Sequence, residues 1–396
     1  MNNRERVHAI LHYQDYDRMP VVHFGYWRET LEKWAAEGHI TVEEAQTWGD
    51  GNPTGAVIAA KLGFDFNWST CYGPATRLRP AFETKVIRKL PDGGRHIQND
   101  EGVIVLQKDD AISIPQEIEH LLKDRASWEE HYLPRLQYSD ARVTRAWVNC
   151  DGVMVRFDQG GLDYLQRGVW TNPYGISVGS LFGVIRDWIG IVGLSYMLAD
   201  DPELLQEIVD VTAEVCYQTT KTTLELVCPN GGAPPAGGVA PFDFAHFWED
   251  ISFKSGPLIS PRTFRRMTGH HYQRLTELVN RYGIDIVSLD SDGDITKLVP
   301  VWLENGVNTM FPIEVGTWRS SIAPWRAQYG RELRGVGGMD KVVFSRDYAA
   351  VDAEIERLKP LVDLGGYIPC PDHRIAPDAK WENVQYYCER MRKTFG

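Results

Sequence analysis

The chain has 396 residues, of which 43% are hydrophobic and 24% charged, proportions typical of a globular protein with a large buried core. Its net charge of −12 argues against a nucleic-acid or anionic-membrane partner, because both require a basic face. No apolar run approaches a membrane span, and residues 1–6 lack the apolar stretch of a signal peptide. The six cysteines are far apart, without a CxxC pair, so we expect reduced thiols in a cytoplasmic protein.

The first third of the chain alternates between helical and strand-like patterns. Residues 4–14 predict an amphipathic helix, 21–24 a short buried strand and 28–37 a second helix. The segment from about 75 to 115 has alternating apolar residues punctuated by Asp-Gly-type turns, which predicts an antiparallel insertion. Residues 116–136 return to a helical pattern.

From about residue 150 the pattern becomes regular, with short apolar strands alternating with amphipathic helices. The predicted strands are 153–157, 174–178, 242–248, 284–289, 309–313, 333–336 and 367–370. The predicted helices are 201–226, 261–281, 296–304 and 347–362, the first opened by an Asp201-Pro202 cap. Such alternation indicates a parallel sheet covered by helices, either open or closed into a barrel. No GxGxxG or GxxxxGK[ST] motif follows a strand, so the nucleotide-binding open forms lack their signature.

Acidic residues or a histidine follow five consecutive predicted strands: Glu249 and Asp250, Asp290 and Asp292, Glu314, Asp340, and Asp372 and His373. The carboxyl ends of parallel barrel strands meet on one face, where catalytic residues lie. Any one of these acids could simply cap a helix, but five in succession predict a functional cluster.

A metal ion would explain this cluster. Asp290 and Asp292 are two residues apart and face the same side if both lie on extended chain. Carboxylates held together repel, so one keeps its proton or a cation neutralises the group. With Glu314 and His373 they form a donor set suited to Zn²⁺, Mn²⁺ or non-haem iron. A hydrogen-bonded network without metal is the alternative.

Other residues are candidates for the substrate pocket. We expect Asp292, Glu249 and His373 to be catalytic; Lys254 offers Glu249 the alternative of a structural ion pair. The candidate substrate-binding residues are His23, Trp27, Arg28, His246, Trp248 and Phe311, although a buried histidine such as His246 more often belongs to the core. An apolar cleft is predicted from Phe24, Trp27, Phe182, Trp248, Phe311 and Trp318.

Several motifs resemble those of the uroporphyrinogen decarboxylase-like superfamily. They are Asp-Arg-Met-Pro-Val at 17–21, the block from His246 to Pro261, Gly-Gly-Met-Asp-Lys at 337–341, the segment 365–373 and Trp-Glu-Asn-Val at 381–384. The resemblance covers nearly the whole chain and implies a single-domain TIM (β/α)8 barrel over residues 1–396. It places an N-terminal elaboration with the antiparallel insertion at about 1–145 and regular β/α units at about 146–396.

Within this superfamily the sequence is most similar to the methyltransferase branch. Zinc-dependent members carry His-x-Cys after one strand and a Cys after the last, and related methionine synthases add a Glu between them. Here Asp290-x-Asp292, Glu314 and His373 occupy those places, which implies a divalent metal, zinc first, bound by harder ligands. The lost thiolates argue against a thiol acceptor. The decarboxylases grip a polyacid with an Arg-rich block, for which this chain offers Arg28 alone.

The resemblance implies methyl transfer from a small substrate, a methoxy-arene or a methylamine, to a corrinoid. No Asp-x-His-x-x-Gly stretch is present, so we expect a partner protein to supply the corrinoid. One alternative is a decarboxylase or lyase of a small or tetrapyrrolic acid. Another is a non-catalytic protein that binds a corrinoid or tetrapyrrole. The oligomeric state is left open, and a homodimer is compatible with the sequence.

Overall fold

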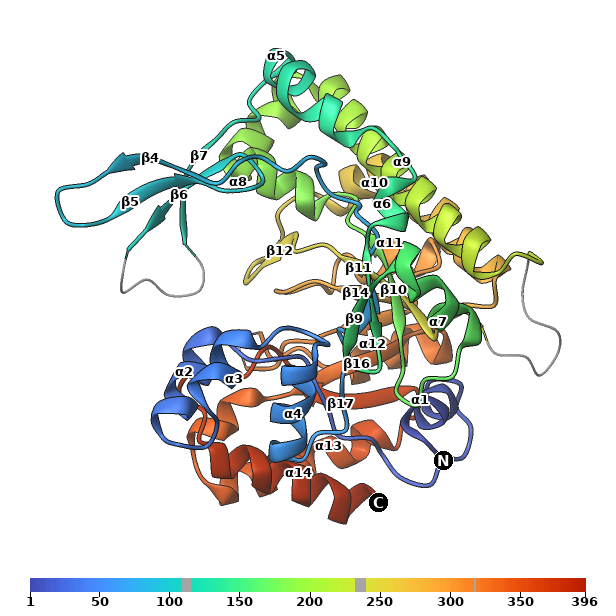
Figure 1. Ribbon diagram of the computed structural model, residues 1–396. Helices are drawn as coiled ribbons and strands as arrows, with labels where there is room; N and C mark the ends of the chain where they lie inside the picture. The colour runs from blue at the N-terminus through green and yellow to red at the C-terminus, as the bar shows by residue number, and fades with distance from the viewer. Residues whose placement is uncertain (109–114, 232–239, 317) are drawn as a thin grey trace.

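The centre of the molecule is a seven-stranded parallel sheet (Figure 1). The computed structural model describes residues 1–108, 115–231, 240–316 and 318–396. In spatial order the strands are β17 (Tyr367–Pro371), β16 (Arg334–Met339), β15 (Thr309–Phe311), β14 (Val287–Asp290), β11 (Phe244–Trp248), β10 (Gly175–Gly179) and β3 (Cys71–Tyr72). Six of the seven correspond to strands predicted after residue 150, with ends displaced by a few residues.

A second parallel pair lies between the two edges of this sheet. It consists of β1 (Val22–His23) and β2 (Phe66–Asn67). Residues 68–70 separate β2 from β3; Trp68 N–H bonds back to β1 at the His23 oxygen (3.0 Å), and Gly175 N–H of β10 bonds to the Thr70 oxygen (3.0 Å). On the other side, Tyr26 forms a parallel bridge with Ile375, just beyond β17. This arrangement is consistent with a TIM-like fold.

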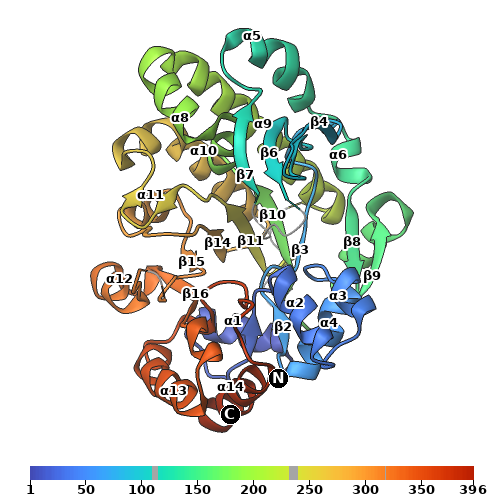
Figure 2. The same ribbon diagram turned by 90° about the vertical axis from the view of Figure 1, so that its left-hand side faces the viewer.

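Fourteen α-helices occur among the described residues, and several contact the strands directly, as α9 does β10 and α13 does β17. The N-terminal helices lie beside the C-terminal ones (Figures 1 and 2). The fourteen α-helices are α1 (Asn3–Leu11), α2 (Arg28–Ala36), α3 (Val42–Thr47), α4 (Pro53–Leu62), α5 (Arg125–Ser127), α6 (Ala141–Thr144), α7 (Gly161–Arg167), α8 (Gly183–Asp200), α9 (Pro202–Val227), α10 (Pro261–Arg281), α11 (Val299–Glu304), α12 (Ile322–Tyr329), α13 (Tyr348–Val362) and α14 (Trp381–Phe395).

Local sequence explains where the long helices begin. Asp201 caps α9 as predicted, because its side chain accepts a hydrogen bond from Leu204 N–H (3.0 Å), and Pro202 occupies the first turn. Ser260 and Pro261 start α10 in the same way. Buried residues recur along α10 every three or four positions, so one face of the helix packs inward.

The predicted antiparallel insertion is confirmed. It is a four-stranded sheet of β4 (Lys85–Lys89), β5 (Arg95–Gln98), β6 (Val103–Gln107) and β7 (Gln116–His120), which projects to the side of α8 (Figure 1). Residues 109–114, which the predicted insertion included, lie outside the described residues. The prediction of helix from residue 116 is wrong, because 116–120 pair with β6 and helical structure begins only at α5. Tertiary pairing here overrides local helix propensity.

The predicted central strand at 153–157 is also wrong. β9 (Val153–Arg156) forms an antiparallel hairpin with β8 (Trp147–Cys150) instead. Asp151 and Gly152 turn the hairpin with φ of 52° and 92°, as an Asp-Gly pair at a tight turn favours. The sequence analysis missed β2, which pairs with β1, and β3, the edge strand of the seven-stranded sheet. A further short antiparallel pair is β12 (Ser252–Phe253) with β13 (Gly256–Pro257).

One contiguous cluster of buried apolar side chains runs from Val7 to Met391. All six cysteines are free thiols, as predicted. Within the described ranges, no helix is both long enough and apolar enough to cross a bilayer.

Candidate functional site

Three aspartates meet at the carboxyl ends of two neighbouring strands. Asp290 ends β14, Asp292 follows two residues later, and Asp250 lies just beyond β11. Trp248 and Asp290 are partners in the sheet register, which brings the two strand ends together. One oxygen of each aspartate lies within 4.8 Å of the others. Asp292 N–H also donates to Asp250 Oδ1 (3.1 Å), so the three aspartates form one group.

His373 joins this group from the opposite end of the chain. It follows β17, and its Nε2 lies 3.1 Å from Asp292 Oδ2. The imidazole stacks on Trp27, with ring centroids 5.2 Å apart and an interplanar angle of 18°. Asp292 Oδ1 is buried and has no hydrogen-bond partner among the described residues. An orphaned carboxylate oxygen beside two other carboxylates and an imidazole is a suitable ligand for a cation.

Glu314 takes a different position from the one predicted. Its Oε2 accepts hydrogen bonds from Gly293 N–H and from Trp318 Nε1–H, both 2.6 Å long. It therefore holds the loop that carries Asp292 and lies outside the three-aspartate group. Asp250 takes the place in the group that the sequence analysis assigned to Glu314.

Burial and mutual repulsion make protons or a cation necessary here. Burial, reinforced by the charge of Asp292, raises the pKa of Asp250 to about 7. The same causes raise the pKa of Asp290 well above its ordinary value, and that of Glu314 more moderately. Two carboxylates ~4 Å apart at an effective dielectric near 20 repel by roughly 4 kcal/mol. The group either retains protons near neutral pH or binds a cation, and its oxygen and nitrogen donors fit a hard or borderline divalent ion.

Arginines surround the aspartates, and each is paired with an acid. Arg374 binds Asp50 (2.5 Å) and Arg186 binds Asp187 (2.9 Å). Burial raises the pKa of Asp187 to about 6. The guanidinium of Arg77 lies over the Trp248 ring, 5.0 Å from its centroid. A cavity of about 130 Å³ opens beside them, lined by Thr76, Arg77, Ser177, Gly179, Ser180, Val184 and Trp248.

Aromatic rings form one side of the site. Phe24 packs edge-on against Phe311 (4.7 Å) and His373 (5.4 Å). His246 lies two register positions before Trp248, on the same face of β11, and its ring centroid is 5.9 Å from that of Phe311. Burial lowers the pKa of His246 to about 4, so this imidazole is neutral at physiological pH.

Phe182 does not belong to the predicted cleft. Its side chain is fully buried and packs edge-on against Phe264 of α10, with ring centroids 5.9 Å apart. Trp318 lies at the margin of the site, where its ring faces Phe253 at 6.4 Å.

Glu249 has a structural environment rather than the predicted catalytic one. Its carboxylate is fully buried and accepts hydrogen bonds from the backbone N–H groups of Leu181, Phe182 and Gly183, at 2.6 to 2.9 Å. The hydroxyls of Ser180 and Tyr272 donate to it as well (3.1 and 2.6 Å). A carboxylate is stabilised at a helix N-terminus, so Glu249 anchors the start of α8 to the end of β11.

His23 and Arg28 also lie away from the aspartates. His23 is buried against Phe64 and Tyr26, on the opposite face of β1 from Phe24, and burial lowers its pKa to about 3. Arg28 pairs with Glu32 one turn along α2, and its side chain is 75% exposed. Of the six predicted substrate-binding residues, the structure brings Trp27, His246, Trp248 and Phe311 to the site.

The sequence analysis included Asp250 in the predicted acidic cluster but gave it no catalytic or metal-binding role, and it missed Arg374 and Asp50. Strand alternation carried the signal for Asp250: with Trp248 facing the site, Glu249 must face outward and Asp250 inward. Arg374 directly follows His373, so the motif that identified His373 could also have pointed to Arg374. Asp50 is 324 residues from its partner Arg374, and no local pattern links them.

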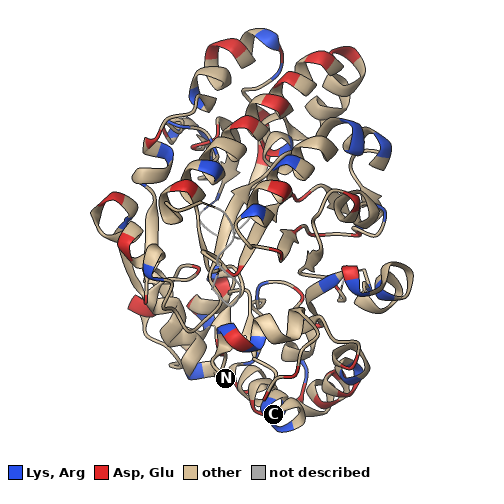
Figure 3. Ribbon diagram, turned by 90° about the vertical axis from the view of Figure 1, so that its right-hand side faces the viewer, with Lys and Arg blue, Asp and Glu red and all other residues tan. Residues whose placement is uncertain are grey.

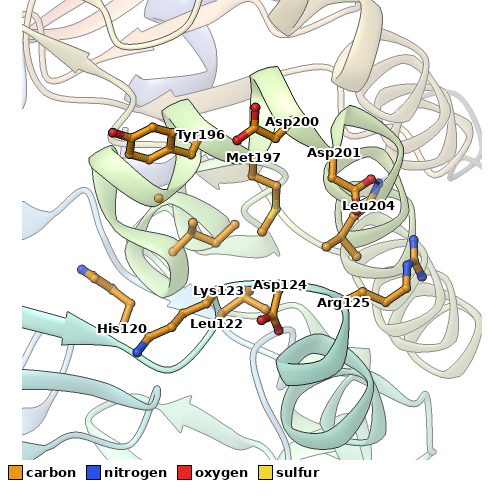
Figure 4. Close-up of a pocket in the computed structure, with 12 residues that line it drawn as sticks. His120, Leu122, Lys123, Asp124, Arg125, Tyr196, Met197, Asp200, Asp201 and Leu204 are labelled. Atoms are coloured by element: carbon orange, nitrogen blue, oxygen red, sulfur yellow. Dashed lines mark hydrogen bonds between the residues drawn. The ribbon is translucent and has the colours of Figure 1, made fainter.

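Two larger cavities lie elsewhere. One of about 410 Å³ lies between β7–α5 and α8–α9, and its lining includes Lys123, Arg125, Asp200 and Asp201 (Figure 4). Another of about 360 Å³ lies beside α4 and includes His23. Acidic and basic residues are interspersed along the helices (Figure 3). Neither larger cavity includes a residue of the aspartate group.

No protein-family model and no curated protein matches the chain. Among solved structures it is similar to a methyltransferase from Methanosarcina mazei, with 15% identity and a TM-score of 0.59 over 99% of this chain and 98% of that one. A partial likeness covers 59% of this chain and 68% of a putative vitamin-B12 independent methionine synthase from Listeria monocytogenes, at 13% identity and a TM-score of 0.32. At 15% identity, the first likeness shows a shared fold along the whole chain.

Proposed function

We propose that the protein is a cytoplasmic methyltransferase that moves a methyl group from a small methylated substrate to a corrinoid carried by a partner protein. The observation that carries the proposal is the group of Asp250, Asp290 and Asp292 with His373 at the strand ends. The proposal includes closure of the sheet into a TIM barrel of the uroporphyrinogen decarboxylase-like superfamily, supported by β1, β2 and the Tyr26–Ile375 bridge. The description of the similar Methanosarcina mazei protein as a methyltransferase supports the reaction class.

The surroundings of the aspartates suit a methoxy-arene or a methylamine. Trp27 supplies partly exposed aromatic surface next to the carboxyl groups, and the buried rings of Phe24 and Phe311 pack behind it. When the methyl group leaves, the bond between its carbon and the substrate oxygen or nitrogen breaks, and that atom gains an electron pair and needs a proton. A carboxyl whose pKa is raised to about 7, such as Asp250, retains a proton to donate to it.

Asp290, Asp292 and His373 would hold a divalent metal, with zinc the first candidate, while Asp250 beside them keeps its role as the proton donor. Such an ion supplies Lewis acidity that stabilises negative charge on the departing oxygen. Glu314 would keep Asp292 in place through Gly293. The chain itself thus provides the ligands, the proton and the aromatic surface.

A decarboxylase is the main alternative, because arginines beside a site favour carboxylate substrates. The structure has Arg77, Arg186 and Arg374 nearby, but the last two are paired with Asp187 and Asp50, and Arg77 with Glu101. The neutralised arginines and the aspartate group disfavour a polyanionic substrate.

The test is to mix the purified chain with a corrinoid protein reduced to cobalt(I) and a methoxylated arene or a methylamine. We expect methylation of the corrinoid, followed by its visible spectrum, and release of one equivalent of the free phenol or amine. Asp292→Asn should abolish this turnover. The matched control is Asp294→Asn, since Asp294 lies two residues away and its side chain accepts a hydrogen bond from Thr296 N–H in its own loop.

Turnover of uroporphyrinogen without any corrinoid would overturn the proposal in favour of a decarboxylase. Tight corrinoid binding without methyl transfer from either substrate class would favour a non-catalytic binding protein. Metal analysis of the wild type and of Asp292→Asn tests the metal separately from the reaction.

A further inference from the structure

A second group of potential metal ligands lies on the outer helices. Asp210 is on α9, and His270 and His271 are consecutive residues at the middle of α10. Their ligand atoms lie within 4.8 Å of one another. Because α9 and α10 pack side by side (Figure 1), the group bridges two helices.

The three side chains are already oriented toward one another. His271 is 8% exposed, and its Nε2 lies 2.8 Å from Asp210 Oδ1. Consecutive helical residues point about 100° apart, yet the His270 and His271 rings have centroids only 3.8 Å apart. Gln206, one turn before Asp210, donates to Asp210 Oδ1 (2.8 Å) and to the Met267 oxygen (3.2 Å). The carboxylate and the buried imidazole are thus held in place, while exposed His270 can adjust its ring.

The positive charge next to this group belongs to Arg274, and it is already neutralised by another residue. Arg274, one turn after His270, bonds to Glu214 (2.5 Å) and stacks on Tyr217, with its guanidinium carbon 3.5 Å from the ring centroid. Both partners lie further along α9 than Asp210, so the arginine is engaged next to the group without occupying it.

We propose that Asp210, His270 and His271 form a surface site for a borderline divalent ion, Cu²⁺ or Zn²⁺, with water completing the coordination. Two imidazoles and one carboxylate are ligands typical of these ions, which bind at about 2.0–2.2 Å. The required convergence of the ligand atoms is achieved by rotation of the His270 side chain.

An ion at this site would link α9 to α10. The residue after His271 is Tyr272, whose hydroxyl donates to Glu249, the anchor of α8 (2.6 Å). The site would therefore stabilise the helix that supports the end of β11. It is separate from the strand-end aspartates, and its existence does not depend on the proposed reaction.

The experiment titrates the chelator-treated full chain with Cu²⁺ and with Zn²⁺. We expect one equivalent to bind at this site with a Kd below about 10 μM, and the Cu²⁺ EPR spectrum to show coupling to imidazole nitrogens. His270→Ala should weaken that binding at least tenfold and should fold normally, because His270 is exposed. Asp210→Asn should weaken it as well. Zn²⁺ should raise the Tm of the wild type more than that of His270→Ala.

Two controls separate this site from other metal binding. His131→Ala removes a histidine from a distant helical turn, and we expect it to keep full binding. Asp292→Asn should also retain this equivalent, whatever it does at the strand ends. Equal affinity in the wild type and His270→Ala, or equal loss in His131→Ala, would overturn the proposal.

Discussion

Replacing Asp250 by Asn should make the protein more stable at alkaline pH. The pKa of Asp250 is about 7 in the folded protein, against an ordinary value of 3.8. The folded state therefore binds this proton more tightly than the unfolded state. The resulting stability is fully present below pH ~4 and is lost as the pH rises through ~7.

The magnitude follows from the difference between these two pKa values, which corresponds to roughly 4 kcal/mol for an isolated buried group. Asp250 is partly exposed and titrates together with Asp290 and Asp292, so solvent screening and sharing of protons reduce the effect of replacing it. We expect Asp250→Asn to gain about 1–2 kcal/mol over the wild type at pH 8 and almost nothing at pH 4.

The assay is urea unfolding of chelator-treated protein, followed by tryptophan fluorescence between pH 4 and 8. The wild type should lose stability across this range more steeply than Asp250→Asn, whereas Asp294→Asn should follow the wild type. Parallel curves for the wild type and Asp250→Asn would refute the reasoning, because they would show that Asp250 releases its proton equally in both states.

Three further substitutions test other parts of the structure. His373→Ala should abolish methyl transfer and cost about 1–2 kcal/mol in unfolding stability, since it removes the contact with Asp292 and the ring contacts with Trp27 and Phe24; unchanged stability would contradict this. Glu249→Gln should cost about 2–4 kcal/mol in urea unfolding, because an amide N–H₂ would face backbone N–H donors; an unchanged midpoint would show that α8 needs no carboxylate. Gly183→Ala places a Cβ 2.8 Å from the Glu249 backbone and should cost about 1–3 kcal/mol, with wild-type stability as the contrary result.

The strand–helix alternation after residue 150 was readable because each unit carries its own pattern of buried residues. The strand predictions failed where pairing between segments distant in sequence decides the structure. β7 is a strand because β6 lies beside it, and β2 and β3 have only two paired residues each, too few for periodicity to reveal.

The site could be predicted in part for a similar reason. Asp290, Asp292 and His373 follow strand ends, and the fold brings strand ends together. The sequence analysis assigned the site role to Glu249 instead of Asp250, because the roles of these two residues depend on which face of β11 each one occupies. His23 was misplaced by one residue in the same way, since Phe24 and not His23 faces the site. The pairing of Asp50 with Arg374 depends on the complete fold.

The Tyr26–Ile375 bridge has a consequence for how the protein folds during its synthesis. Trp27 leaves the ribosome well before His373, yet their rings stack in the finished site. During synthesis, the edge next to β1 that later bridges to Ile375 stays unpaired until β17 and the residues after it have left the ribosome. A nascent chain that stalls before residue 373 would contain all three aspartates but neither the imidazole nor the contact that joins the two ends. The complete site therefore forms only after residue 373 has been synthesised.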